Sequence, residues 1–137
     1  MYLIAFPLLL IPFALYNMIV FLLNMPFSDV VLSLPLAQGR GLPVTTGDLL
    51  VMLAMLLLYL EVLKAARLAS KGVMDQLLAV ILFAGMAAEL ALVPRAATTT
   101  LLLLAVLAFV DVITGISFAV RRQPRPLTQA DDDFAPR

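Results

Sequence analysis

The sequence predicts an all-α protein: an integral membrane four-helix bundle whose N-terminus and C-terminus both lie in the cytoplasm. Two observations predict this fold class. Hydrophobic residues fill 64% of the 137 positions and mean hydropathy is +1.09, well above the values of soluble domains. These residues are concentrated in four runs, each near the length that crosses a hydrocarbon core about 30 Å thick. The runs are residues 1–23, 49–66, 73–93 and 99–120.

The first run contains two prolines, Pro7 and Pro12, which should bend its helix. It carries no Lys or Arg ahead of its apolar stretch, and no small-residue cleavage site follows it closely. Both features are required of a secretory signal peptide. We therefore expect this run to be kept as the first membrane span.

The ends of the other runs carry helix-capping signals. Thr45 and Asp48 stand at the start of the second run, where a hydroxyl and a carboxylate suit the positive end of a helix dipole. Pro94 closes the third run, and Thr98–Thr100 precede or open the fourth. The sequence thus predicts three further helices with short connections.

Two segments lie outside the predicted spans. In the external loop 24–47, residues 30–36 are apolar, residues 38–41 resemble a turn and residues 42–46 favour β-structure. We expect a short hairpin at the periplasmic interface, with an interfacial helix as the alternative. Residues 121–137 hold three prolines and three consecutive aspartates, which predicts a disordered cytoplasmic tail after a transmembrane domain of residues 1–120.

Positive charge predicts the orientation. Cytoplasmic loops of membrane proteins carry an excess of Lys and Arg close to the span ends. Six such residues fall on one side of the predicted bundle and two on the other. The six are Lys64, Arg67, Lys71, Arg121, Arg122 and Arg125, and the two are Arg40 and Arg95. This bias predicts a multi-pass protein of the cell inner membrane with cytoplasmic termini.

Missing residue types exclude several functions. The sequence has no Cys, which excludes disulfide chemistry and thiolate metal sites, and no His, which excludes bis-imidazole haem ligation. We expect no cofactor and no metal. The net charge of zero provides no basic face for nucleic acid. With no Trp in the chain, interfacial anchoring is left to Tyr2, Tyr16 and Tyr59 and to charged residues that flank the spans.

Charged and polar residues within the spans are the candidate functional residues, because charge at membrane depth is costly. At about 1.5 Å per residue, Glu61 and Asp111 fall within about 4 Å of the midplane. With Lys64, three residues after Glu61, they form a candidate intramembrane polar cluster. A second polar layer toward the periplasm holds Asn17, Glu89 and Arg95.

These carboxylates have two interpretations. They are either hydrogen-bonding partners that fix helix packing or contact another subunit, or a relay for protons or cations. No spacing selects a two-carboxylate catalytic site, so we expect no enzyme. The favoured function is a non-catalytic accessory or interaction subunit of a membrane complex, in contact with the lipid bilayer and with a membrane-protein partner or a second copy of the chain. The alternative is a small proton- or ion-coupled transporter or channel component.

Four stretches resemble a group of small, uncharacterised four-span proteins of the bacterial inner membrane. They are IPFALYNMIVFLL at 11–23, TGDLL at 46–50, YLEVLKAAR at 59–67 and ATTTLLLLAVLAFVDVITG at 97–115. The resemblance covers most of the chain outside the external loop and the tail. It implies a bacterial inner-membrane location, and it implies no catalytic residue because the group has no assigned activity.

Overall fold

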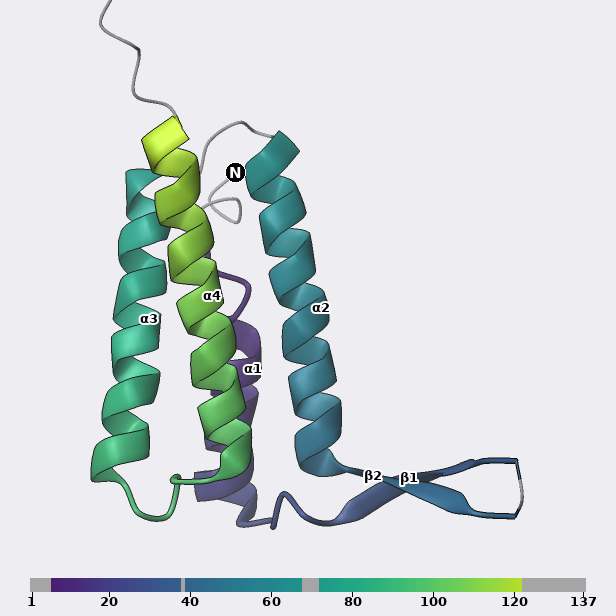
Figure 1. Ribbon diagram of the computed structural model, residues 1–137. Coiled ribbons are helices and arrows are strands. Elements are labelled where there is room, and N and C mark those ends of the chain that lie inside the picture. The colour runs from purple at the N-terminus through teal and green to yellow at the C-terminus, as the bar shows by residue number, and fades with distance from the viewer. Residues whose placement is uncertain (1–5, 38, 68–71, 122–137) are drawn as a thin grey trace, which may run out of the picture.

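The computed structural model describes residues 6–37, 39–67 and 72–121. Their secondary structure is mostly helical, with one small sheet (Figure 1). In chain order the elements are α1 (Leu10–Asn17), the π-helical segment η2 (Met18–Leu23), β1 (Val30–Pro35), β2 (Gly41–Thr45), α2 (Thr46–Arg67), α3 (Val73–Leu92) and α4 (Thr99–Arg121). Apart from Arg121, the predicted tail 121–137 lies outside the described residues, as do Tyr2 and Lys71.

The three helices predicted at 49–66, 73–93 and 99–120 are confirmed. They contain 22, 20 and 23 residues, and all three are long and apolar enough to cross a membrane. The helix α2 begins at Thr46, three residues earlier than the apolar run, because Thr45 and Asp48 cap each other. The Thr45 N–H donates to Asp48 Oδ2 (2.9 Å) and the Asp48 N–H donates to Thr45 Oγ1 (3.2 Å).

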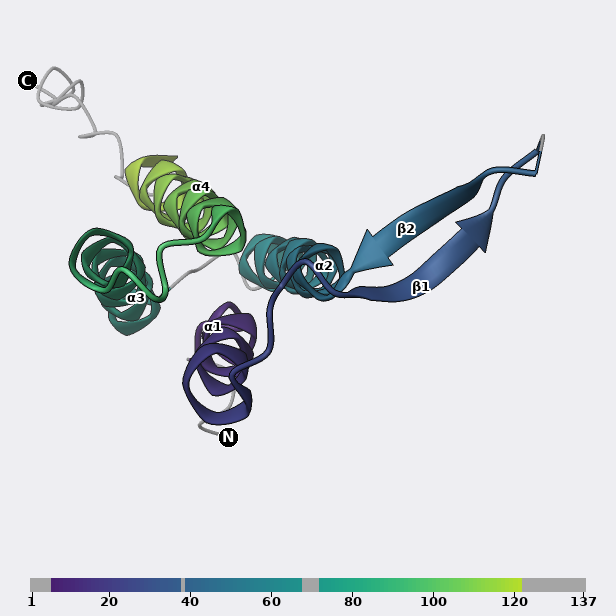
Figure 2. The same ribbon diagram turned by 90° about the horizontal axis from the view of Figure 1, so that it is seen from below.

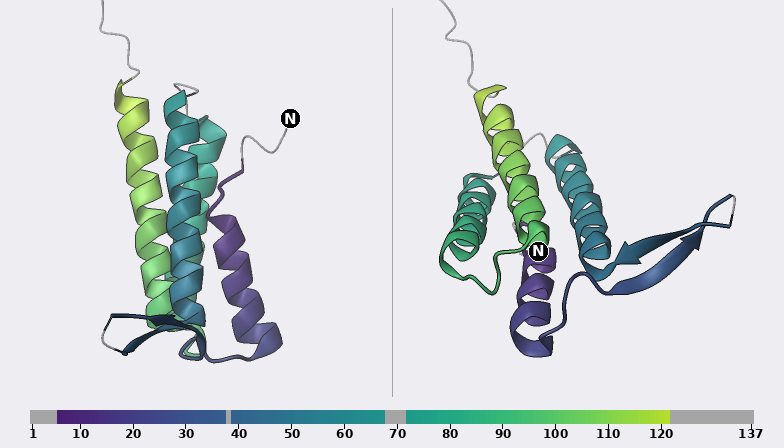
Figure 3. Two further views of the ribbon diagram at one scale, coloured as in Figure 1. Left: turned by 90° about the vertical axis from the view of Figure 1, so that its right-hand side faces the viewer. Right: turned by 60° about the horizontal axis from the view of Figure 1, so that its bottom comes forward.

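The prediction of one continuous helix over residues 1–23 is wrong within its described part. Helical structure covers only Leu10–Leu23, which at 1.5 Å per residue is about 21 Å and shorter than a hydrocarbon core. Residues 6–9 form turns instead, because Pro7 and Pro12 have no N–H to donate to a preceding carbonyl. In Figure 3 (left) α1 lies beside only part of the neighbouring helices, at the end near the hairpin.

The predicted hairpin in the external loop is confirmed. The strands β1 and β2 pair antiparallel, with Leu34 opposite Leu42 and Leu32 opposite Val44, and a β-bulge falls between Val30 and Leu32. At the turn Gly39 has a φ of 71°, a left-handed conformation that glycine accommodates without strain. The hairpin projects sideways beyond the helices at one end of the bundle (Figures 1 and 2).

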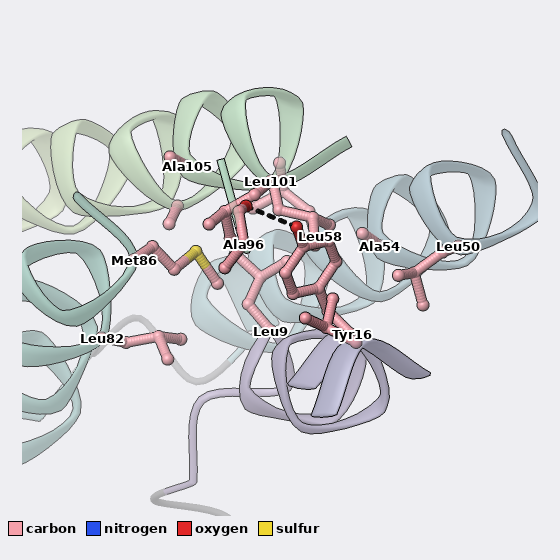
Figure 4. Packing of buried hydrophobic residues seen from close by; sticks show 13 residues of the cluster. Leu9, Tyr16, Leu50, Ala54, Leu58, Leu82, Met86, Ala96, Leu101 and Ala105 are labelled. Carbon is pink, nitrogen blue, oxygen red and sulfur yellow. Dashed lines mark hydrogen bonds between the residues drawn. The ribbon is translucent and has the colours of Figure 1, made fainter. Parts of the chain in front are cut away.

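The helices form one bundle in which α4 contacts both α2 and α3, and α1 packs against α2 and α4 (Figure 2). On α2 the buried residues recur every three or four positions and form one stripe: Gly47, Leu50, Ala54, Leu58, Glu61 and Ala65. The largest fully buried side chains include Tyr16, Leu9, Met86, Leu101 and Leu104, which come from α1, α3, α4 and the turn before α1 (Figure 4). Small residues in these stripes permit close helix contact.

Candidate functional site

The two carboxylates predicted near the midplane face the interior of the bundle. Glu61 lies on the buried stripe of α2 and is 3% exposed, while Asp111 lies on the buried face of α4 and is 1% exposed. Lys64 is partly buried on α2, and each of these three residues has an interaction partner. Small residues, Ala65 on α2 and Ala108 and Gly115 on α4, lie one turn away on the same buried faces.

Of the three residues predicted for the second polar layer, Asn17 and Glu89 are in contact and Arg95 is not part of the pair. Asn17 Nδ2 donates to Glu89 Oε2 at 3.3 Å and also to the Phe13 carbonyl at 3.1 Å, so the amide connects α1 to α3. Arg95 forms no hydrogen bond or ion pair with either of these two residues. It lies in the segment between α3 and α4, and its Nη2 donates to Asn24 Oδ1 after the end of η2.

Tyr16 provides a buried anchor that the sequence did not predict. The expected interfacial role of this tyrosine is wrong, because its side chain is 0% exposed. Its hydroxyl donates to the Ala96 carbonyl at 2.6 Å (Figure 4). The same hydroxyl lies 2.7 Å from Thr98 Oγ1. The ring stacks on Phe27 with centroids 4.7 Å apart. Tyr16 therefore fixes α1 to the segment that precedes α4.

A second feature that the sequence did not predict is a cavity of about 660 Å³, which we call the hairpin-end cavity. It lies where η2 ends and where α2 and α4 begin. Its lining combines apolar side chains with polar ones, which include one arginine and one aspartate. The lining residues are Val20, Asn24, Met25, Pro26, Phe27, Ser28, Thr45, Gly47, Asp48, Val51, Arg95, Thr98, Thr99, Thr100 and Leu103.

A groove of about 530 Å³ runs between α3 and α4 and is almost wholly apolar. Phe83 and Phe109 line it, with ring centroids 5.5 Å apart, and so do Ala87, Ala91 and Ala105. Neither Glu61 nor Asp111 lines this groove or the hairpin-end cavity. Within the described residues, no three His, Cys, Asp or Glu side chains are grouped so that they could hold a metal ion.

The described part of the chain is thus a helical bundle with three helices long and apolar enough to cross a membrane. Comparison of the chain with protein-family models, with curated proteins and with solved structures finds no match.

Proposed function

We propose that the chain is a multi-pass protein of the cell inner membrane with both termini in the cytoplasm. Three helices of suitable length support this proposal. Many large apolar side chains on their outer faces also support it, because exposing so much apolar surface to water is unfavourable. The first run would supply the fourth crossing, with α1 and η2 in the half of the membrane nearest the hairpin. An even number of crossings places the two termini on the same side.

This topology predicts the result of a reporter experiment. A reporter fused after Arg137 should be cytoplasmic and one inserted beside Gly39 should be periplasmic, because six of the eight near-membrane basic residues lie on the first side. Matched alkaline phosphatase and fluorescent protein fusions at both positions measure this. A periplasmic C-terminal reporter would reverse the orientation of every loop.

We propose further that the protein is a non-catalytic accessory or interaction subunit of a membrane complex. The observation that carries this proposal is the hairpin, which projects beyond the bundle and leaves apolar side chains exposed on both strands. Leu32, Leu34 and Leu42 are about half exposed and lie on one face, since Leu34 is directly opposite Leu42. Ser33, Pro43 and Gly41 occupy the other face. The leucine face is thus a compact apolar surface outside the core.

The prolines of the hairpin favour side-chain docking over sheet extension. The Leu36 N–H donates to the Arg40 carbonyl, so the alternation of an antiparallel pair places Pro35 and Pro43 at positions whose backbone nitrogens point outward. Each outer edge therefore lacks a donor that an added strand would require. We propose that the occupant of the leucine face is an apolar surface of a partner membrane protein at the periplasmic interface.

The test compares two hairpin variants in native membranes. Leu34→Ser with Leu42→Ser should reduce recovery of the co-purified partner at least about tenfold, because losing two apolar side chains from an interface costs more than the roughly 1.4 kcal/mol that corresponds to that factor. Leu34→Met with Leu42→Met should retain it. Affinity purification with quantitative mass spectrometry measures both, and the melting temperature of each variant shows that the fold is intact. Equal recovery with the two variants would contradict the proposal.

The transporter alternative has one observation in its favour, the two buried carboxylates. Glu61 and Asp111 lie in a packed helix interface, however, and not on the hairpin-end cavity or on the groove between α3 and α4. This placement suits a role in fixing helix packing. Proton flux into liposomes that contain the purified protein, abolished by Asp111→Asn or Glu61→Gln with the fold intact, would decide for transport instead.

A further inference from the structure

The hairpin-end cavity has two chemically different walls. Val20 on η2, Val51 on α2 and Leu103 on α4 form the apolar wall, about one turn inside the helix ends. Leu103 is exposed on the outer face of α4, so this wall continues into the surface that would face lipid. The rest of the lining includes hydroxyl groups and Arg95. A ligand matched to both walls is an amphiphile.

The beginning of α4 supplies hydrogen-bond donors to the cavity. At the start of a helix the first N–H groups have no partner inside the helix, and they favour negative charge. Thr98 Oγ1 accepts the Leu101 N–H at 3.3 Å, but the N–H groups of Thr99 and Thr100 have no hydrogen-bond partner among the described residues. Both residues line the cavity.

The beginning of α2 lines the same cavity but offers no such donors. Its first N–H groups are already bonded: Thr46 donates to the Asp29 carbonyl (3.0 Å), Gly47 donates to the Phe27 carbonyl (3.1 Å), and Asp48 donates to Thr45 Oγ1. Asp48 Oδ2 accepts from the Thr45 N–H and, at 2.7 Å, from Thr45 Oγ1. An anion is therefore expected on the α4 side of the cavity, away from this carboxylate.

Thr100 gives independent support for a ligand. Its side chain is 9% exposed, it lines the cavity next to Gly47, and its hydroxyl has no hydrogen-bond partner among the described residues. Because the rest of this side chain is buried, a partner for the hydroxyl has to come from the cavity that Thr100 lines. The Thr100 hydroxyl and the two N–H groups belong to residues that line the same cavity, at the kind of helix N-terminus that binds anions in other proteins.

Arg95 supplies the counter-charge. Its guanidinium has five N–H donors, and among the described residues the only group that it bonds is Asn24 Oδ1. Nothing in the described part of the chain forms an ion pair with it. An Arg that lines the same cavity as open backbone N–H groups suits the planar, bidentate recognition of a phosphate group.

We propose that the hairpin-end cavity binds the phosphate group of an amphiphile, an anionic phospholipid, between Arg95, Thr100 and the first turn of α4, with an acyl chain along Val20, Val51 and Leu103. This inference rests on the membrane insertion proposed above and deepens it, because it names a lipid that the bundle would hold at its periplasmic end. It does not depend on the partner proposed for the hairpin.

The test uses the full chain purified in a neutral detergent, with native mass spectrometry to count retained lipid. With phosphatidylglycerol as the probe, we expect one retained lipid on the wild type, binding at least about tenfold weaker for Arg95→Gln and a few-fold weaker for Thr100→Val. Arg40→Gln removes an equally exposed positive charge from the hairpin, outside the cavity, and should bind like the wild type. Unchanged melting temperatures show that the variants fold.

Two further probes distinguish the source of the phosphate. A neutral glycolipid with the same acyl chains should not be retained, and inorganic phosphate at millimolar concentration should not displace phosphatidylglycerol. Displacement by inorganic phosphate alone would overturn the lipid assignment, and equal retention by Arg95→Gln and the wild type would overturn the site. Either failure leaves the recovery of a hairpin partner unchanged, so it is distinguishable from failure of the proposed function.

Discussion

Replacing Tyr16 with phenylalanine is expected to lower the free energy of unfolding by about 0.5–1.5 kcal/mol, the usual net contribution of one hydrogen bond. The phenolic hydroxyl donates to the Ala96 carbonyl at 2.6 Å, and Ala96 is itself fully buried. That carbonyl also accepts the Thr98 N–H at 2.8 Å, so the substitution removes one of its two hydrogen bonds. Thr98 also loses a neighbour at 2.7 Å, although its Oγ1 still caps Leu101.

Thermal unfolding in detergent, followed by circular dichroism or by a thiol-independent dye, measures this effect. Tyr59→Phe is the matched control, because Tyr59 is 59% exposed on α2 and no hydrogen bond ties its hydroxyl to another described residue. It should unfold within about 0.5 kcal/mol of the wild type, as surface substitutions usually do. If the two variants had the same stability, Tyr16 would not be the anchor of α1.

The three long helices and the hairpin could be predicted from the sequence because the residues that determine them are close together in the chain. Runs of apolar residues match the thickness of a membrane, and Thr45 with Asp48 marks the start of α2 within four positions. The glycines around Arg40 separate two β-prone segments, and Gly39 indeed adopts a left-handed conformation. Each of these features depends on neighbours within a few residues.

The first run shows where local reasoning fails. Its composition alone predicts a full-length helix, yet Pro7 and Pro12 confine the described helix to Leu10–Leu23. Tyr16 in this run suggested an interfacial anchor, whereas packing against Phe27 and the Ala96 carbonyl buries it. Those partners are far from Tyr16 in sequence, so no local pattern could indicate them.

The sequence likewise could not predict whether the two carboxylates face the bundle interior or the lipid. A helix that is apolar on every side has no polar face, so periodicity does not distinguish the side that contacts another helix from the side that contacts lipid. The levels of Glu61 and Asp111 followed from their positions in the runs, but their burial at 3% and 1% follows from how α2 and α4 pack. The hairpin-end cavity is assembled from the ends of three helices and was not predicted for the same reason.

A side chain at position 47 should disrupt the contact between α2 and α4. Gly47 lies in the first turn of α2, and a Cβ there would stand 2.5 Å from Thr100 Oγ1 and 3.4 Å from the Phe27 carbonyl oxygen. Thr100 cannot easily turn away, because a β-branched side chain in a helix has few rotamers. We expect Gly47→Ala to lower the free energy of unfolding by about 1–3 kcal/mol, the range for overpacking a close contact, and Gly47→Val to lower it further.

Gly85 provides the matched control for this prediction, since it lies within α3 and a Cβ at that position would meet nothing within 4 Å. Gly85→Ala should therefore raise the free energy of unfolding by about 0.4–1 kcal/mol, because alanine restricts the unfolded chain and favours the helix. The two single variants thus have opposite expected signs for one and the same chemical change, and thermal unfolding in one detergent measures both. Stabilisation by both substitutions would mean that α2 and α4 are not in close contact at Gly47.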